Sequence, residues 1–121
     1  MASVKSLAVS AALVALVFFP QAGRAADDDL GYDVGYKAMR AHDWATAEKQ
    51  LVAGLEKNPD NVFRQLNLAW VYAQTGRKTE AAMIYRKILM SDQNQTAALA
   101  SREAQPVKIL AERGLKLLEA N

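Results

Sequence analysis

Few residues of this sequence are suited to acid–base or nucleophilic chemistry. The 121-residue chain contains one histidine, His42, and no cysteine. A serine nucleophile needs a base that a third group orients, and Ser91 and Ser101 would have to share this single histidine. His42 falls at a predicted turn between two helices, where a solvent-exposed residue is the simpler interpretation. The sequence therefore predicts a chain that is not an enzyme, with no catalytic residue.

No cofactor or metal site is predicted either. Zinc needs three or four converging nitrogen, sulfur or oxygen ligands, which one histidine does not supply. The run Asp27–Asp29 lacks the spaced ligands of a calcium loop, and acidic residues ahead of a helix are expected to complement its dipole. Other carboxylates are expected to be solvated helix residues: Glu56, Glu80, Glu103 and Glu112.

The N-terminal segment has the organisation of a secretory signal peptide. Lys5 precedes an apolar run, Leu7–Phe19, and small residues follow up to Ala25. A short basic start, an apolar stretch and a small-residue exit are typical of exported precursors. The run is shorter than the roughly 20 residues of a membrane-spanning helix. We therefore expect cleavage after Ala25 and a periplasmic or secreted protein, attached to the membrane only through the removed segment 1–25.

Removal of this segment changes the charge balance. The full chain has 15 basic and 13 acidic side chains, a formal charge of +2. Lys5 and Arg24 leave with the segment, so that 13 basic side chains oppose 13 acidic ones. A nucleic-acid partner is then not expected, because its main electrostatic argument is lost. The lack of cysteine in a chain sent to an oxidising compartment favours a bacterial envelope protein that packing alone stabilises.

The rest of the chain contains an internal repeat of about 34 residues. Apolar positions recur at spacings of three and four, as in amphipathic helices. When the sequence is offset by one repeat, small and large positions coincide, as for Ala47 and Ala81. The pattern predicts two helix–turn–helix units, 28–61 and 62–95.

This period and pattern resemble the tetratricopeptide repeat, a helix–turn–helix unit. In the second unit, Gln65 replaces the usual tryptophan, and in the first, His42 replaces the turn glycine. The positions of the second unit that match the family are Leu68, Ala69, Tyr72, Gly76, Ala81, Tyr85 and Ile88. The resemblance implies an all-α solenoid of α–α hairpins with a non-catalytic, protein-binding role.

The predicted domain, 26–121, comprises the two units and a C-terminal cap. The first helix is expected over about 29–41, and Asp43 is expected to cap the second. The third helix is expected to begin after Asp60 or Asn61 and to end at Gly76. The cap is needed because a solenoid must cover its terminal core edge.

The cap, 96–121, departs from the repeat. In a third unit Pro106 would fall inside the first helix, where it removes a hydrogen bond and clashes with the preceding turn. We therefore expect a short helix near 96–104, a break at Gln105–Pro106 and a helix over about 107–119.

A second apolar stripe on the third predicted helix is the candidate binding surface. Phe63, Leu66 and Trp70 recur at i, i+3 and i+7, while Leu68 and Tyr72 occupy the core side. In tetratricopeptide folds the first helix of each unit lines a concave groove. The resemblance assigns the groove to Tyr32, Tyr36, Met39, Phe63, Leu66, Asn67 and Trp70. The cations with which some family members bind a terminal carboxylate are missing from the equivalent positions.

Two interpretations of this stripe stay open. In one, the C-terminal helix or a second copy of the chain fills it. In the other, a segment of another envelope protein docks against its aromatic residues, which dominate binding hot spots. We expect an adaptor or scaffold of the cell envelope, and replacing Tyr36 and Trp70 with alanine should then abolish capture without unfolding the protein. The alternative is a self-associating structural subunit of an envelope or export assembly.

Overall fold

The computed structural model describes residues 32–98 and 103–120. For residues 32–34 and 98 it describes the backbone but not the side chains. The predicted signal segment, 1–25, lies outside these residues. In chain order the elements are α2 (Tyr32–Arg40), α3 (Trp44–Lys57), α4 (Val62–Gln74), α5 (Lys78–Met90), β1 (Thr96–Ala98), β2 (Ala104–Pro106) and α6 (Val107–Ala120). None of the described helices is long and apolar enough to cross a membrane.

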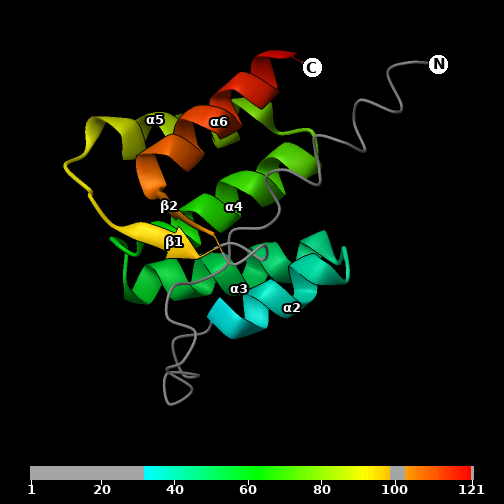
Figure 1. The fold of residues 1–121 in the computed structure, drawn as a ribbon. Coiled ribbons are helices and arrows are strands. Elements are labelled where there is room, and N and C mark those ends of the chain that lie inside the picture. Colours follow the sequence, from blue (N-terminus) through cyan, green and yellow to red (C-terminus); the bar gives the residue numbers. More distant parts are fainter. Residues whose placement is uncertain (1–31, 99–102, 121) are drawn as a thin grey trace.

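The helices stack in sequence order as two hairpins, α2–α3 and α4–α5, followed by α6 (Figure 1). Each helix contacts the next along the chain, and α4 also contacts α6. Ala47 and Ala81, the equivalent small residues of the two repeats, are completely buried, as expected where paired helices approach closely. The prediction of an all-α hairpin solenoid is confirmed.

Two apolar clusters form the core. One lies between α2, α3 and α4 around Leu51, and the other lies between α4, α5 and α6 around Tyr85. Tyr72 and Ile84 pack against both clusters, so the core is continuous. Burial raises the pKa of the Tyr85 hydroxyl well above its ordinary value, and this residue therefore stays neutral.

Both hairpins turn in the same way. After α4, Gly76 has φ 82°, and after α2 the equivalent residue, His42, has φ 61°. In each case the N–H of the next residue donates a hydrogen bond back into the helix. Asp43 donates to the Ala38 carbonyl oxygen at 2.9 Å, and Arg77 donates to that of Tyr72 at 2.8 Å. This is the Schellman motif, which places a left-handed residue after the helix. His42 therefore occupies a backbone position that favours glycine.

The predicted starts of α3 and α4 are also confirmed, whereas the start predicted near residue 29 lies outside the described residues. The carboxylate of Asp43 accepts a hydrogen bond from the Thr46 N–H at 3.2 Å. The amide oxygen of Asn61 accepts from the N–H groups of Phe63 and Arg64 at 3.1 and 3.0 Å. Each side chain satisfies donors that the first helical turn leaves unpaired.

Replacing His42 with glycine is expected to raise the free energy of unfolding by about 0.5–1 kcal/mol. The left-handed conformation costs a non-glycine residue about 1–2 kcal/mol, which exceeds the extra chain entropy of glycine. The variant loses a stacking contact between the exposed His42 and the half-buried Trp44, whose ring centroids lie 5.3 Å apart. Urea unfolding measures the difference. Gly76→Ala is the reciprocal control and should lose stability, because alanine is strained at φ 82°. No atom lies within 4 Å of the added methyl group, so this loss reports the backbone strain alone. A less stable His42→Gly variant would show that the stacking outweighs the backbone strain.

Arg77, the residue before α5, connects the second hairpin to the first. Its guanidinium forms a two-point ion pair with Glu48 of α3, with Nη1 3.1 Å from Oε2. The guanidinium carbon also lies 4.5 Å from the centroid of the Tyr72 ring. The hydrogen bond from Arg77 lowers the pKa of Glu48 below its ordinary value of 4.5, although desolvation opposes the change.

The Glu48→Gln variant is expected to lose a pH-dependent part of the stability. The pKa of Glu48 is lower in the folded state than in the unfolded state. The ion pair therefore contributes its full stability above the unfolded-state pKa, and this contribution is lost as the pH falls through the folded-state pKa. Urea titrations at about pH 7 and about pH 3 should show a stability difference from the wild type that is larger at the higher pH. A difference of equal size at both values would mean that the charge of Glu48 is irrelevant.

The prediction of a short helix near 96–104 is wrong. β1 and β2 form an antiparallel pair in which Ala97 lies opposite Gln105. Pro106 disfavours the helical conformation for Gln105, and Ala97 is completely buried in the core cluster of α4, α5 and α6. The predicted break and the last helix, expected over about 107–119, are confirmed by α6.

Candidate partner-binding surface

The surface predicted to bind a partner is centred on α4, the helix with neighbours on most sides. α4 contacts α2, α3, α5 and α6, and Val62 and all residues of 64–71 are buried. A helix that is apolar on two faces must cover both or offer one to a partner. Both stripes of α4 are largely covered.

The predicted site residues differ in exposure. Met39, Leu66 and Trp70 are buried, with 5%, 3% and 6% of their surface exposed, whereas Tyr36 and Phe63 are half-buried. The guanidinium carbon of Arg40 lies 5.7 Å from the Tyr36 ring centroid. Asn67 is 1% exposed, and the side chain of Tyr32 lies outside the described residues. The structure thus buries four of the predicted residues in the helix packing and leaves Tyr36 and Phe63 half-buried; the four are Met39, Leu66, Asn67 and Trp70.

The last helix packs along part of the predicted groove. Leu66 shares a cluster with Val107 and Leu110 of α6, and Leu117 packs against the cluster that contains Trp70. The expectation that Trp70 can be removed without cost to the fold is therefore wrong, because truncating a buried tryptophan typically costs about 3–5 kcal/mol.

Three buried polar atoms of α4 have no hydrogen-bond partner among the described residues. They are Oδ1 and Nδ2 of Asn67 and Nε1 of Trp70. Residues at i and i+3 lie on the same face of a helix, and Phe63, one turn before Asn67, continues that face to the surface. The large majority of buried side-chain polar atoms in native proteins have a partner. A group of three on one helix face therefore needs an explanation.

Other buried polar side chains of α4 are satisfied, which makes this group stand out. The Gln65 amide nitrogen donates to the carbonyl oxygen of Pro59 at 2.7 Å. The Arg64 guanidinium donates to the carbonyl oxygen of Gly54 at 3.3 Å, and an added Cβ on Gly54 would lie 2.7 Å from Arg64 Nε. Both side chains hold the α3–α4 connection in place and have a structural role.

A model of the tetratricopeptide repeat matches residues 38–105, more than half of the chain. The chain belongs to the tetratricopeptide repeat family. Tetratricopeptide repeats generally mediate protein–protein interaction, and the family is typically non-catalytic. Searches of curated proteins and of solved structures each return no significant match.

In this tetratricopeptide repeat protein the remaining polar candidates have local roles. The Ser91 hydroxyl donates to the Ile88 carbonyl oxygen at 2.6 Å, at the end of α5, and His42 is exposed at the turn of the first hairpin. Ser101 lies outside the described residues. The described residues contain no group of histidine, cysteine, aspartate or glutamate side chains that could hold a metal ion.

Sequence reasoning placed Asn67 and Trp70 on the binding face but missed their shared feature. Whether a buried amide is paired depends on tertiary neighbours, and Gln65 and Asn67 differ in this respect although both are buried amides of α4. The signal in the sequence that could have indicated this feature is the pair Asn67 and Trp70, two side chains with polar tips at i and i+3 in an otherwise apolar stripe.

Proposed function

We propose that this protein is a non-catalytic adaptor of the bacterial cell envelope that binds an extended segment of a partner protein at the concave face of α2 and α4. The observation that carries the proposal is the unpaired polar group of Asn67 and Trp70. Leaving such groups unsatisfied costs about 1–3 kcal/mol each. Because Asn67 and Trp70 are 1% and 6% exposed, a partner must first displace the side chains that cover them. Pairing these atoms with the partner would then supply binding free energy.

The chemistry of the three atoms favours a peptide backbone. The asparagine amide offers a donor and an acceptor, and the indole offers only a donor. Each non-proline residue of an extended segment presents one N–H and one C=O group, so a single strand can pair with both sides of the amide and with the indole. A carboxylate or phosphate supplies acceptors only and would leave Asn67 Oδ1 unpaired.

The surface around these atoms suits such a segment. Tyr36 and Phe63 are both half-buried, and aromatic side chains are enriched in binding hot spots. We propose that they pack against the partner's side chains while Asn67 and Trp70 bind its backbone.

Photo-crosslinking in the intact envelope tests this proposal. A photoreactive phenylalanine in place of Tyr36 keeps an aromatic ring, and mass spectrometry identifies what it captures. We expect a discrete foreign protein from position 36 and none from position 119, where the exposed Glu119 lies at the far end of α6. Crosslinks confined to the chain itself would show that this face is filled internally.

The envelope location rests on the predicted signal segment and has its own test. N-terminal sequencing of the protein recovered from the periplasmic or extracellular fraction should begin at Ala26, because the cleavage site is predicted after Ala25. A chain that keeps Met1 and stays in the cytoplasm would contradict this part of the proposal.

A further inference from the structure

The site of Asn67 and Trp70 is closed in this structure. Asn67 is 1% exposed and Trp70 is 6% exposed, although three polar atoms of these side chains lack a hydrogen-bond partner among the described residues. A segment that pairs with these atoms can bind only after a neighbouring side chain moves. The element that moves therefore controls access to the proposed binding site.

The end of α6 lies against this site. Leu117 is half-buried and packs against the cluster that contains Trp70. Each residue of 115–120 is half-buried or exposed. The buried residues of α6 all lie earlier in the helix, at Val107, Leu110, Ala111 and Gly114. The helix thus has an anchored first part, 107–114, and a less buried end, 115–120.

Gly114 lies at the boundary between the two parts of α6. The Tyr85 ring occupies the place of a Cβ at this residue, so that only a hydrogen atom fits there. This contact anchors the helix to α5. Glycine is a poor helix former, so the helix is most readily interrupted at the same residue. α6 can therefore lose its end while residues 107–114 stay packed.

The charges at the end of α6 do not stabilise it. Basic residues lie in the last turns of α2, α3 and α5, where they complement the helix dipole. In the described part of α6 the last turn holds no basic residue, and Glu119 places a carboxylate there. A negative charge near the C-terminus of a helix is unfavourable. Burial, glycine and charge all make residues 115–120 the part of α6 that opens at the lowest cost in free energy.

We propose that residues 115–120 of α6 form a cover, which closes the site in the free protein and opens for the partner. Its role rests on the proposed function, since it regulates access to the same site. Opening withdraws Leu117 and uncovers the Trp70 side chain. The vacated place is apolar, so it suits an aliphatic side chain of the segment whose backbone pairs with Asn67 and Trp70. The apparent affinity for the partner is then the intrinsic affinity multiplied by the fraction of open molecules.

Hydrogen exchange of the Trp70 indole N–H tests the cover without a partner. In the protein as the cell processes it, this exchange should hardly depend on low urea concentrations, because a local opening exposes little new surface. The amide of Tyr85, a residue that is 1% exposed in the core, should exchange through global unfolding and depend steeply on urea. We expect the Trp70 indole to exchange at least about 10-fold faster than global unfolding allows. Exchange of the indole only through global unfolding would overturn the proposal.

Leu117→Ala and Leu89→Ala are a matched pair of variants. Both leucines are half-buried, but Leu89 lies on α5 and packs against the cluster around Tyr85. Leu117→Ala should raise the exchange rate of the Trp70 indole by at least about 10-fold, whereas Leu89→Ala should leave it unchanged at low urea. An equal increase in both variants would show a general loss of stability and would overturn the proposal, as would no increase in Leu117→Ala.

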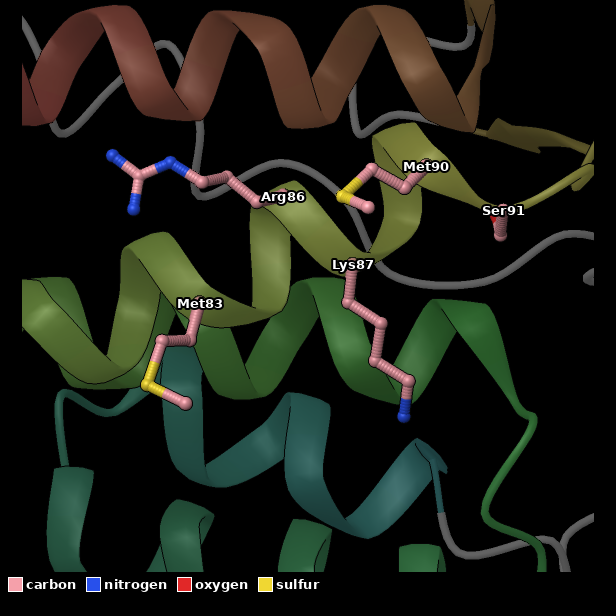
Figure 2. A pocket seen from close by; sticks show the side chains of 5 residues that line it. All are labelled: Met83, Arg86, Lys87, Met90 and Ser91. Atoms are coloured by element: carbon pink, nitrogen blue, oxygen red, sulfur yellow. The ribbon is translucent and has the colours of Figure 1, made fainter.

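Two exposed positions give further controls. Met90 is 85% exposed and lines a hollow on the outer face of α5 (Figure 2), so Met90→Ala should change neither the exchange rate nor the thermal unfolding temperature. Glu119→Lys should slow the exchange of the Trp70 indole by about 3-fold, because a cation replaces the carboxylate in the last turn of α6. Faster exchange in either variant would contradict the role of the helix end.

Capture of the partner separates the cover from the proposed function. With the crosslinker at position 36 in the intact envelope, Leu117→Ala should capture at least about 3-fold more of the foreign protein than the chain with an unchanged α6, because a larger fraction of molecules is open. Equal capture would overturn the cover and leave the proposed function standing. Crosslinks confined to the chain itself in both cases would contradict the proposed function and with it the role of the cover, even where the exchange rates show that α6 opens.

Discussion

Replacing Gly114 with alanine is expected to lower the free energy of unfolding by about 3 kcal/mol. The added Cβ would lie 2.3 Å from Cζ of Tyr85, and Tyr85 is 1% exposed at the centre of the core between α4, α5 and α6. Helix propensity alone predicts the opposite, a gain of about 1 kcal/mol. Equilibrium urea unfolding therefore distinguishes the two effects by the sign of the change.

A double-mutant cycle identifies the cause. In a Tyr85→Leu background the ring is absent, and Gly114→Ala should then cost much less, with a coupling energy of about 1–3 kcal/mol. Gly35→Ala is a graded control, because its Cβ would lie 3.1 Å from a methyl group of Leu51, Cδ2, at the end of a flexible side chain. A Gly114→Ala variant as stable as the wild type would contradict the close packing of α6 on α5.

The Asn67→Leu variant is expected to be more stable than the wild type, by about 2 kcal/mol, because it removes two buried atoms without hydrogen-bond partners. For a domain of this size the gain corresponds to a rise of about 10 °C in Tm. The same change should abolish partner binding, since leucine cannot pair with a peptide backbone. Calorimetry and the crosslinking from position 36 measure the two effects separately.

Gln65 provides a matched control on the same helix. It is also a buried amide, but its nitrogen donates to the Pro59 carbonyl oxygen at 2.7 Å. Gln65→Met keeps the side-chain length and should lower the stability by about 1 kcal/mol, with partner binding unchanged. If Asn67→Leu destabilises the protein as Gln65→Met does, Asn67 is paired in solution and the argument for a backbone-binding site fails.

Most of the fold could be predicted from the sequence because local signals coincide. The repeat pattern predicts where each helix begins and ends. The capping residues Asp43 and Asn61 and the glycine Gly76 agree with it, and the structure has helix ends at these places. The segment 96–104 could not be predicted. Its alanines favour a helix locally, whereas pairing with Gln105 and the burial of Ala97 are non-local and decide the outcome.

The binding surface was predictable only in outline. Helical spacing places Phe63, Asn67 and Trp70 on one face, because this depends on the chain alone. The packing of α6 on that face depends on how the cap folds back, and no periodicity in the repeats encodes it. Asn67 and Gln65 are both buried amides of α4, but only Gln65 has a hydrogen-bond partner. This difference can be recognised only once the neighbours of the two side chains are placed.

The indole N–H resonance of Trp70 tests the central claim most directly. The chain has two tryptophans, and the second, Trp44, begins α3 beside His42 and serves as an internal reference. Addition of the partner segment found by crosslinking should shift the Trp70 indole signal in a proton–nitrogen correlation spectrum and slow its hydrogen exchange, because Nε1 gains an acceptor. The Trp44 signal should not change. A Trp70 signal unchanged at saturating partner would contradict binding of the segment's backbone at Asn67 and Trp70.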